Sequence, residues 1–120
     1  MNQNDKNNLR NFLVTILLQN VNDDKSFNQN IFFINKLNNV IILIAKNEWT
    51  TGWPNFISEL CTSSKTNQNL CENNMKLLQL FSEEINEFWK NSLTTKKAIE
   101  LKTKMQKEFE EVYILCKFIF

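Results

Sequence analysis

The sequence predicts an all-α protein made of antiparallel helical hairpins stacked as an α-solenoid. Apolar residues recur at intervals of three and four along most of the chain, for example at Leu9, Phe12, Leu13, Ile16 and Leu17. No segment sustains the alternation of apolar and polar residues that a strand needs, and Asn-Gly hairpin turns are absent. Short polar loops separate the helical stretches, which favours antiparallel neighbours.

The periodicity predicts five helices, at about 9–20, 28–49, 54–62, 67–90 and 95–119. The polar residues 1–7 are expected to fray. Residues 21–25 read as a loop, with Asp24 or Ser26 as the cap of the second helix. Ser64 or Thr66 is the corresponding candidate for the fourth helix.

The turn between the second and third predicted helices is the most distinctive part of the chain. Gly52 and Pro54 are its only glycine and its only proline, and they lie two residues apart. Proline has no N–H and a fixed φ, so Pro54 suits the first position of a helix. Trp49 and Trp53 are large enough to wedge this structural corner.

Three of the predicted helices carry a wide apolar face. The run Val40–Ala45 is apolar almost all round, so we expect it to be buried on most sides. The second helix has Phe33, Leu37, Val40, Ile41 and Ile44 on its face. In the fourth, Leu70, Leu77 and Phe81 widen a face of Cys71, Met75, Leu78, Ile85, Phe88 and Trp89. The fifth has Ala98, Leu101, Met105, Phe109, Val112, Cys116 and Ile119, and its charged side places Glu100 to pair with Lys104.

These helices group into a first hairpin at about 9–49, a second at 54–90, and the first helix of a third repeat at 95–120. A repeat of this size falls in the HEAT and armadillo range. The chain ends in the apolar Leu115–Phe120 without a cap. We therefore expect residues 1–120 to be a fragment of a larger superhelix, and to self-associate through exposed end faces.

Composition argues against several function classes. A net charge of +1, from 14 basic and 13 acidic residues, gives no basic excess for a nucleic acid or a membrane surface. No apolar run has the length of a membrane span. Histidine is absent, and Cys61, Cys71 and Cys116 form no CxxC pair, so we expect buried thiols and no enzyme, metal or cofactor. The abundant asparagines read as a compositional habit on surfaces and loops.

Three other groups of residues have a structural and a functional reading. Trp49, Trp53 and Trp89 are ligand platforms or, more often at helix ends beside apolar stripes, core residues. Paired carboxylates could serve acid–base chemistry or a metal, but they fit a solvated face better: Glu83, Glu84 and Glu87. The basic residues of the last helix could form a phosphate-binding strip, but interleaved glutamates cancel it: Lys96, Lys97, Lys102, Lys104 and Lys107.

Several blocks of sequence resemble the N-terminal helical repeats of the exportin-1 family of nuclear export receptors, in the importin-β superfamily. At the corner these are Asn47–Trp49 and Gly52–Leu60, and further along Ser63–Thr66, Asn69–Met75 and Leu77–Glu84. Lys36–Asn38, Phe109 and Leu115–Phe118 fit the same alignment. Thr50 departs from it, where the family often has a second proline, and residues 91–95 match poorly.

The resemblance implies a receptor that binds the GTPase Ran in its GTP form and carries proteins with leucine-rich export signals. Such a receptor shuttles between nucleus and cytoplasm through the nuclear pore. Export cargo and nucleoporins would bind elsewhere in the parent, as would inhibitors of the family's reactive cysteine, which none of the three cysteines here represents. The resemblance also implies that the second helix of each N-terminal repeat lines the inner, concave face, where Ran sits.

The resemblance therefore points to polar residues on the second and fourth helices as the Ran face: Lys36, Asn39, Lys46, Glu72, Lys76 and Gln79. For Lys36 and Lys76 a purely solvated role is the alternative reading. The alternative for the whole chain is a free-standing helical adaptor for protein–protein interactions with another partner. On either reading it is no enzyme, and it needs no cofactor.

Overall fold

The computed structural model describes the backbone of residues 2–49, 52–92 and 95–119. Within these ranges it leaves out the side chains of residues 86, 88–92, 95, 97–98, 101, 115–116 and 118–119. The expectations for Phe88, Trp89, Ala98, Leu101, Cys116 and Ile119 therefore lie outside the described side chains. In chain order the helices are α1 (Gln3–Val21), α2 (Asp24–Gln29), α3 (Ile31–Glu48), α4 (Phe56–Ser63), α5 (Gln68–Ser92) and α6 (Thr95–Ile119). These described ranges contain no strand, which confirms the all-α prediction.

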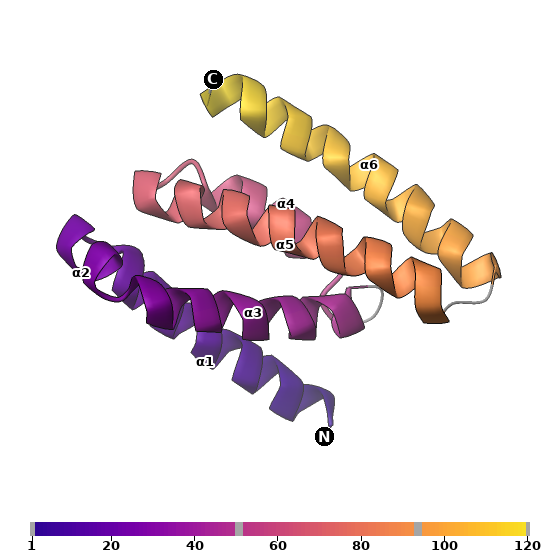
Figure 1. Cartoon of the computed structure of the whole chain (residues 1–120), viewed down its shortest axis with the longest axis horizontal. Coiled ribbons are helices and arrows are strands. Elements are labelled where there is room, and N and C mark those ends of the chain that lie inside the picture. Colours follow the sequence, from indigo (N-terminus) through magenta and orange to yellow (C-terminus); the bar gives the residue numbers. More distant parts are fainter. Residues whose placement is uncertain (1, 50–51, 93–94, 120) are drawn as a thin grey trace.

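The helices stack in three layers (Figure 1). Helices α1 and α3 form the first layer, α4 and α5 the second, and α6 packs on α4 as the third. Helix α3 lies beside α5 and runs in the same direction, whereas α1 runs opposite to α3 (Figure 1). Repeating a helical pair beside its neighbour is the arrangement of an α-solenoid, as the sequence predicts.

The N-terminal part is more helical than its polar sequence suggests. Helix α1 begins at Gln3, because the side chain of Asn2 caps it by accepting a hydrogen bond from the Asp5 N–H at 2.9 Å. The expectation that residues 1–7 fray is therefore wrong for the described part of this segment. The predicted loop at 21–25 is also wrong, because α2 begins within it at Asp24.

Two helix caps and one helix start differ from the sequence-based predictions. The cap of α2 is Asp23, which accepts from the Ser26 N–H at 2.8 Å, and not Asp24 or Ser26. Helix α5 begins after Asn67, whose side chain accepts from the Leu70 N–H at 3.0 Å, in place of Ser64 or Thr66. Helix α4 begins at Phe56, so Pro54 lies in the turn before it and not at its first position.

The core lies between the layers and is centred on aromatic rings. Trp49 meets Phe81 edge-on at 4.9 Å between centroids, and Phe56 meets Phe81 at 5.1 Å. All three side chains are buried. Of the predicted α5 face, Leu78 and Ile85 are buried but Cys71 and Met75 only partly, and Leu70, Leu77 and Phe81 are buried beside them. Cys61 is buried, as expected.

Helix α3 buries only part of the predicted face, because Leu37 and Ile41 are buried and Ile44 is partly buried. Its buried residues are Ile34, Leu37, Asn38, Ile41, Ile42, Ala45 and Glu48. Phe33, Val40 and Leu43 are exposed, so the expectation that Val40–Ala45 is buried on most sides is wrong for two of its residues. The reason is that α1 and α5 cover only part of the helix circumference.

Candidate functional site

The six predicted partner-binding residues lie on α3 and α5, the two helices that run side by side (Figure 1). Between these two helices, Asn38 and Asn73 are buried and exchange two hydrogen bonds. Each amide nitrogen donates to the other residue's Oδ1 at 2.9 Å. Such a reciprocal pair satisfies both amides only in one alignment of the two helices, so it sets how α3 lies against α5.

Polar side chains also connect the two helices at the surface. Lys76 Nζ on α5 donates to Asn35 Oδ1 on α3 at 3.3 Å. Lys46 Nζ on α3 forms an ion pair with Glu84 Oε2 on α5 at 3.4 Å. We call the surface around these contacts the seam surface, and it comprises Asn35, Asn39, Lys46, Glu72, Lys76, Gln79, Glu83 and Glu84.

Five of the six predicted residues belong to the seam surface. Asn39 follows Asn35 by one helical turn, and Glu72 precedes Lys76 by one turn; both are exposed. Gln79 donates to Glu83 at 3.4 Å. Lys36 differs, because it precedes Val40 by four residues and Leu43 by seven, and so shares their side of α3. The structure therefore brings Asn39, Lys46, Glu72, Lys76 and Gln79 onto one surface and places Lys36 beside it.

Sequence reasoning overlooked three residues of the seam surface: Asn35, Glu83 and Glu84. The two glutamates were assigned to a solvated face, which fits the exposed Glu83 but misses the ion pair of the partly exposed Glu84 with Lys46. Glu84 lies 38 positions from Lys46, so spacing along one helix carries no signal for this pair. The mixed charges make the seam surface polar without a strong excess of either sign.

The structural corner joins the first layer to the second. Trp53 is buried, its indole N–H donates to Glu59 Oε2 at 2.8 Å, and its backbone N–H donates to the Glu48 carbonyl at 2.7 Å. The Arg10 guanidinium lies 4.9 Å from the centroid of the Trp53 ring and donates to the Gly52 carbonyl at 3.0 Å. These contacts tie α1 to the turn and thereby hold α3 at a defined angle to α4.

Helix α6 attaches to this corner through Lys104. Its Nζ donates to the Pro54 carbonyl at 3.1 Å, lies 5.2 Å from the centroid of the Trp49 ring, and pairs with Glu108 at 3.3 Å. The predicted partner of Lys104 was Glu100, which is exposed and precedes Lys104 by one helical turn. Glu108 is four residues away in the other direction, toward α4, and forms the pair instead.

The carboxyl group of Glu108 is partly withdrawn from water. Burial raises its pKa above the usual value, while the ion pair with Lys104 and the nearby Trp49 indole lower it, and Glu111 raises it slightly. Within the described ranges, Glu108 Oε2 and the Trp49 indole N–H are both buried without a hydrogen-bond partner. The attachment of α6 therefore includes the Glu108 carboxyl group, and the free-energy cost of burying this group depends on whether it is protonated.

Among the described residues, no group of three or more histidine, cysteine, aspartate or glutamate side chains is placed to hold a metal ion. Likewise, none of the helices in the described part combines the length and apolar character that crossing a bilayer requires.

Comparison with known proteins identifies the class of protein that this stack of helices represents. The family of exportin 1-like proteins matches residues 30–120, which is more than half of the chain. The chain therefore belongs to the exportin 1-like family, and the resemblance seen at the corner and along α5 is confirmed.

Individual relatives agree with this assignment. The chain is 43% identical over 108 residues to exportin-1 of Schizosaccharomyces pombe, which covers 90% of the chain. It is 41% identical to exportin-1 of Dictyostelium discoideum and 37% identical to exportin-1 of Drosophila melanogaster, each over 111 residues and 92% of the chain. It spans about 10% of the length of each of these curated relatives.

Proposed function

We propose that this chain is a segment of a nuclear export receptor and that its seam surface contributes to the binding of Ran in the GTP form. The observation that carries the proposal is the similarity to exportin-1 proteins over nine-tenths of the chain. It is supported by the position of the candidate residues, because α3 and α5 are the second helices of two successive layers and polar contacts join them at the surface.

The segment would act as a scaffold and a contact surface, without catalytic chemistry of its own. Export cargo with leucine-rich signals and nucleoporins would bind other parts of a full receptor, which would shuttle between nucleus and cytoplasm. A solenoid contacts its partner with many layers at once, so a segment of three layers should bind weakly by itself. No single residue of the seam surface is expected to be indispensable.

The geometry suggests different roles for the two seam lysines. Lys46 is half-buried and paired with Glu84, so its charge is already compensated within the chain. Lys76 is exposed, and its hydrogen bond goes to the neutral Asn35 and not to a carboxylate. A partner carboxylate could replace Asn35 as the acceptor without breaking an ion pair. We therefore expect Lys76 to contribute more to binding than Lys46.

The test is an NMR titration of the isotopically labelled chain with Ran loaded with a non-hydrolysable GTP analogue, and separately with GDP. The expected result is a set of shifts concentrated on α3 and α5, with the GTP form only. The variant Lys76→Glu should weaken the binding by about tenfold, which corresponds to about 1.4 kcal/mol.

The matched control is Lys107→Glu, which makes the same charge change at an exposed position of α6. It should bind Ran as the original chain does. Equal weakening by both variants would indicate an effect of net charge and not of the seam surface. Shifts that are absent with both nucleotide forms would overturn the claim that these layers carry a usable Ran surface.

A further inference from the structure

The amide pair of Asn38 and Asn73 lies among buried apolar side chains of α3 and α5. Apart from Asn38, the buried residues of α3 are apolar except for Glu48, the last residue of the helix. On α5 the neighbouring Asn74 is also buried, but its amide donates to the Leu60 carbonyl of α4 at 3.1 Å. The pair of Asn38 and Asn73 is therefore a buried polar contact in the middle of α3, and it is directed at α5 alone.

The two hydrogen bonds of this pair contribute more to alignment than to stability. Burial removes both amides from water and their mutual hydrogen bonds offset that loss, so an apolar pair of similar shape would stabilise the contact about as well. A hydrogen bond differs from an apolar contact in its geometry, because donor and acceptor must stay within about 3.2 Å of each other and well aligned. Two such bonds in opposite directions fix the position of α3 along α5.

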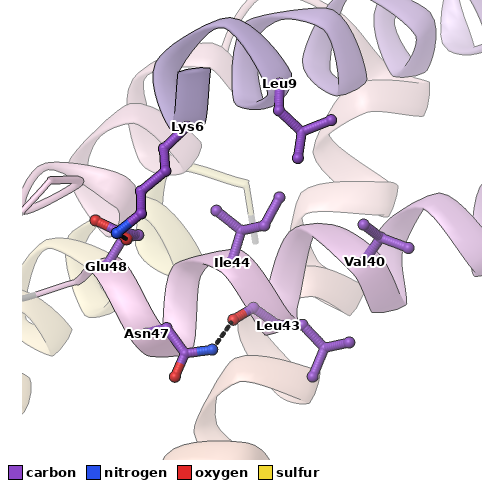
Figure 2. Close-up of a pocket in the computed structure, with 7 residues that line it drawn as sticks. All are labelled: Lys6, Leu9, Val40, Leu43, Ile44, Asn47 and Glu48. Atoms are coloured by element: carbon purple, nitrogen blue, oxygen red, sulfur yellow. Dashed lines mark hydrogen bonds and ion pairs between the residues drawn. The ribbon is translucent and has the colours of Figure 1, made fainter. Parts of the chain in front are cut away.

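The contact of α3 with its other neighbour, α1, is of a different kind. Apolar side chains line the groove between these helices and project toward the space between them (Figure 2). Two polar contacts lie near the ends of α3, where Asn30 donates to Asn20 Oδ1 at 2.9 Å and Lys6 pairs with Glu48 at 2.8 Å. Apolar packing tolerates small shifts before it loses stability. The middle of α3 is therefore held in register on its α5 side.

This register decides how the two halves of the seam surface lie relative to each other. Lys76 donates to Asn35, one turn before Asn38, and Lys46 pairs with Glu84, two turns after Asn38. A partner that contacts both helices meets the residues of α3 and those of α5 at one fixed spacing. If α3 slid along α5 by about 1 Å, contacts made to one helix would draw the partner away from the other.

We propose that Asn38 and Asn73 are positioning residues for the seam surface. They are buried and do not contact a partner, but they hold α3 and α5 in the alignment at which the surface residues of both helices bind it together. The inference rests on the proposed function, the binding of Ran in the GTP form. It gives the pair a role in affinity that is separate from its role in stability.

The experiment compares affinity with stability in the double variant Asn38→Leu/Asn73→Leu. No buried amide is left unsatisfied, so the chain should remain folded. Its affinity for Ran loaded with the GTP analogue, measured by NMR titration, should nevertheless fall about tenfold, within the range for residues that act without touching the ligand. Nuclear Overhauser contacts between α3 and α5 should change in the same variant. If leucine overpacks the site, Asn38→Ala/Asn73→Ala removes the same hydrogen bonds with smaller side chains.

The matched control is Asn74→Leu, because it removes a buried amide of the same helix whose hydrogen bonds lead to α4 and not to α3. This variant should lower the free energy of unfolding and leave the affinity of the folded chain for Ran unchanged. If the amides of Asn38 and Asn73 were merely structural, affinity would follow stability in every variant, and that result would overturn the inference.

Two further outcomes would overturn the inference and leave the proposed function standing. One is a double variant that binds Ran as tightly as the original chain does. The other is a double variant whose contacts between α3 and α5 are unchanged. Failure of the original chain to bind Ran would instead overturn the proposed function, and this inference with it.

Discussion

Asn38 and Asn73 show how much a single pair of residues can determine in a stack of helices. Both lie on sides of their helices that are otherwise apolar, and both are buried with each other as hydrogen-bond partners. The interpretation of asparagine as a compositional habit is therefore wrong for these two positions. It is also wrong for Asn74, which is buried and donates to Ser64 Oγ and to the Leu60 carbonyl.

At this pair, replacing one partner should be more harmful than replacing both. Asn73→Leu leaves the Asn38 amide buried without a partner, which should lower the free energy of unfolding by about 1–3 kcal/mol. The double variant Asn38→Leu/Asn73→Leu leaves no amide unsatisfied and should cost less than the sum of the single variants. Urea unfolding followed by circular dichroism measures all three values.

The adjacent asparagine provides the control for this cycle. Asn39 is exposed, so Asn39→Leu should change the free energy of unfolding by no more than about 0.5 kcal/mol. Additive losses in the double variant would show that the two amides act independently and that the pair does not set the alignment of α3 and α5.

Helix α6 is the element whose attachment depends most on a titratable group. Folding raises the pKa of Glu108 above its usual value near 4.5, mainly through burial. The folded state then binds a proton more tightly than the unfolded state in the pH range just above 4.5. The stability gained from that protonation is present at low pH and is lost as the pH rises through the folded pKa.

Glu108→Gln removes this titration and gives the pH prediction for α6. The free energy of unfolding of the variant, minus that of the original chain, should increase as the pH rises from about 4.5 to about 7. The effect should be modest, because the carboxylate is partly exposed and pairs with Lys104. Urea unfolding at several pH values measures it.

The control for α6 is Glu110→Gln, which removes an exposed carboxylate of the same helix. Its difference from the original chain should stay constant across the same pH range. A constant difference for Glu108→Gln as well would mean that this carboxyl is not desolvated by the docking of α6.

At the scale of the whole molecule, the seam surface would bind a partner mainly through polar and charged side chains. Glu72, Lys76 and Glu83 are exposed, and Lys46 is half-buried in its ion pair with Glu84. Salt screens interactions between exposed charges. Binding at the seam surface should therefore depend on ionic strength.

Raising the NaCl concentration from about 0.1 M to about 1 M tests this dependence. The proposed binding of Ran should weaken several-fold. NMR shifts of the labelled chain measure it at each salt concentration. Binding that salt leaves unchanged would contradict the polar character assigned to the seam surface.

Much of the architecture could be predicted, because it depends on interactions between residues close in sequence. The helical repeat of apolar residues is such a signal, and it is why the helices from α3 onward were expected near their observed places. Short-range signals failed where capping was ambiguous. Asp23 and Asn67 lie within a few positions of other residues that could cap a helix, and the pattern alone does not choose among them.

The sequence by itself determined that the chain is all-α, that its helices stack as a solenoid, and that it belongs to the exportin 1-like family. Periodicity and the blocks of matching residues contain that information. Only the tertiary structure decided which side of α3 is covered, that Asn38 meets Asn73, and that Lys104 turns toward Glu108. These features depend on how helices that are distant in sequence pack against each other. The pattern of apolar residues in one helix does not encode the position of its neighbour.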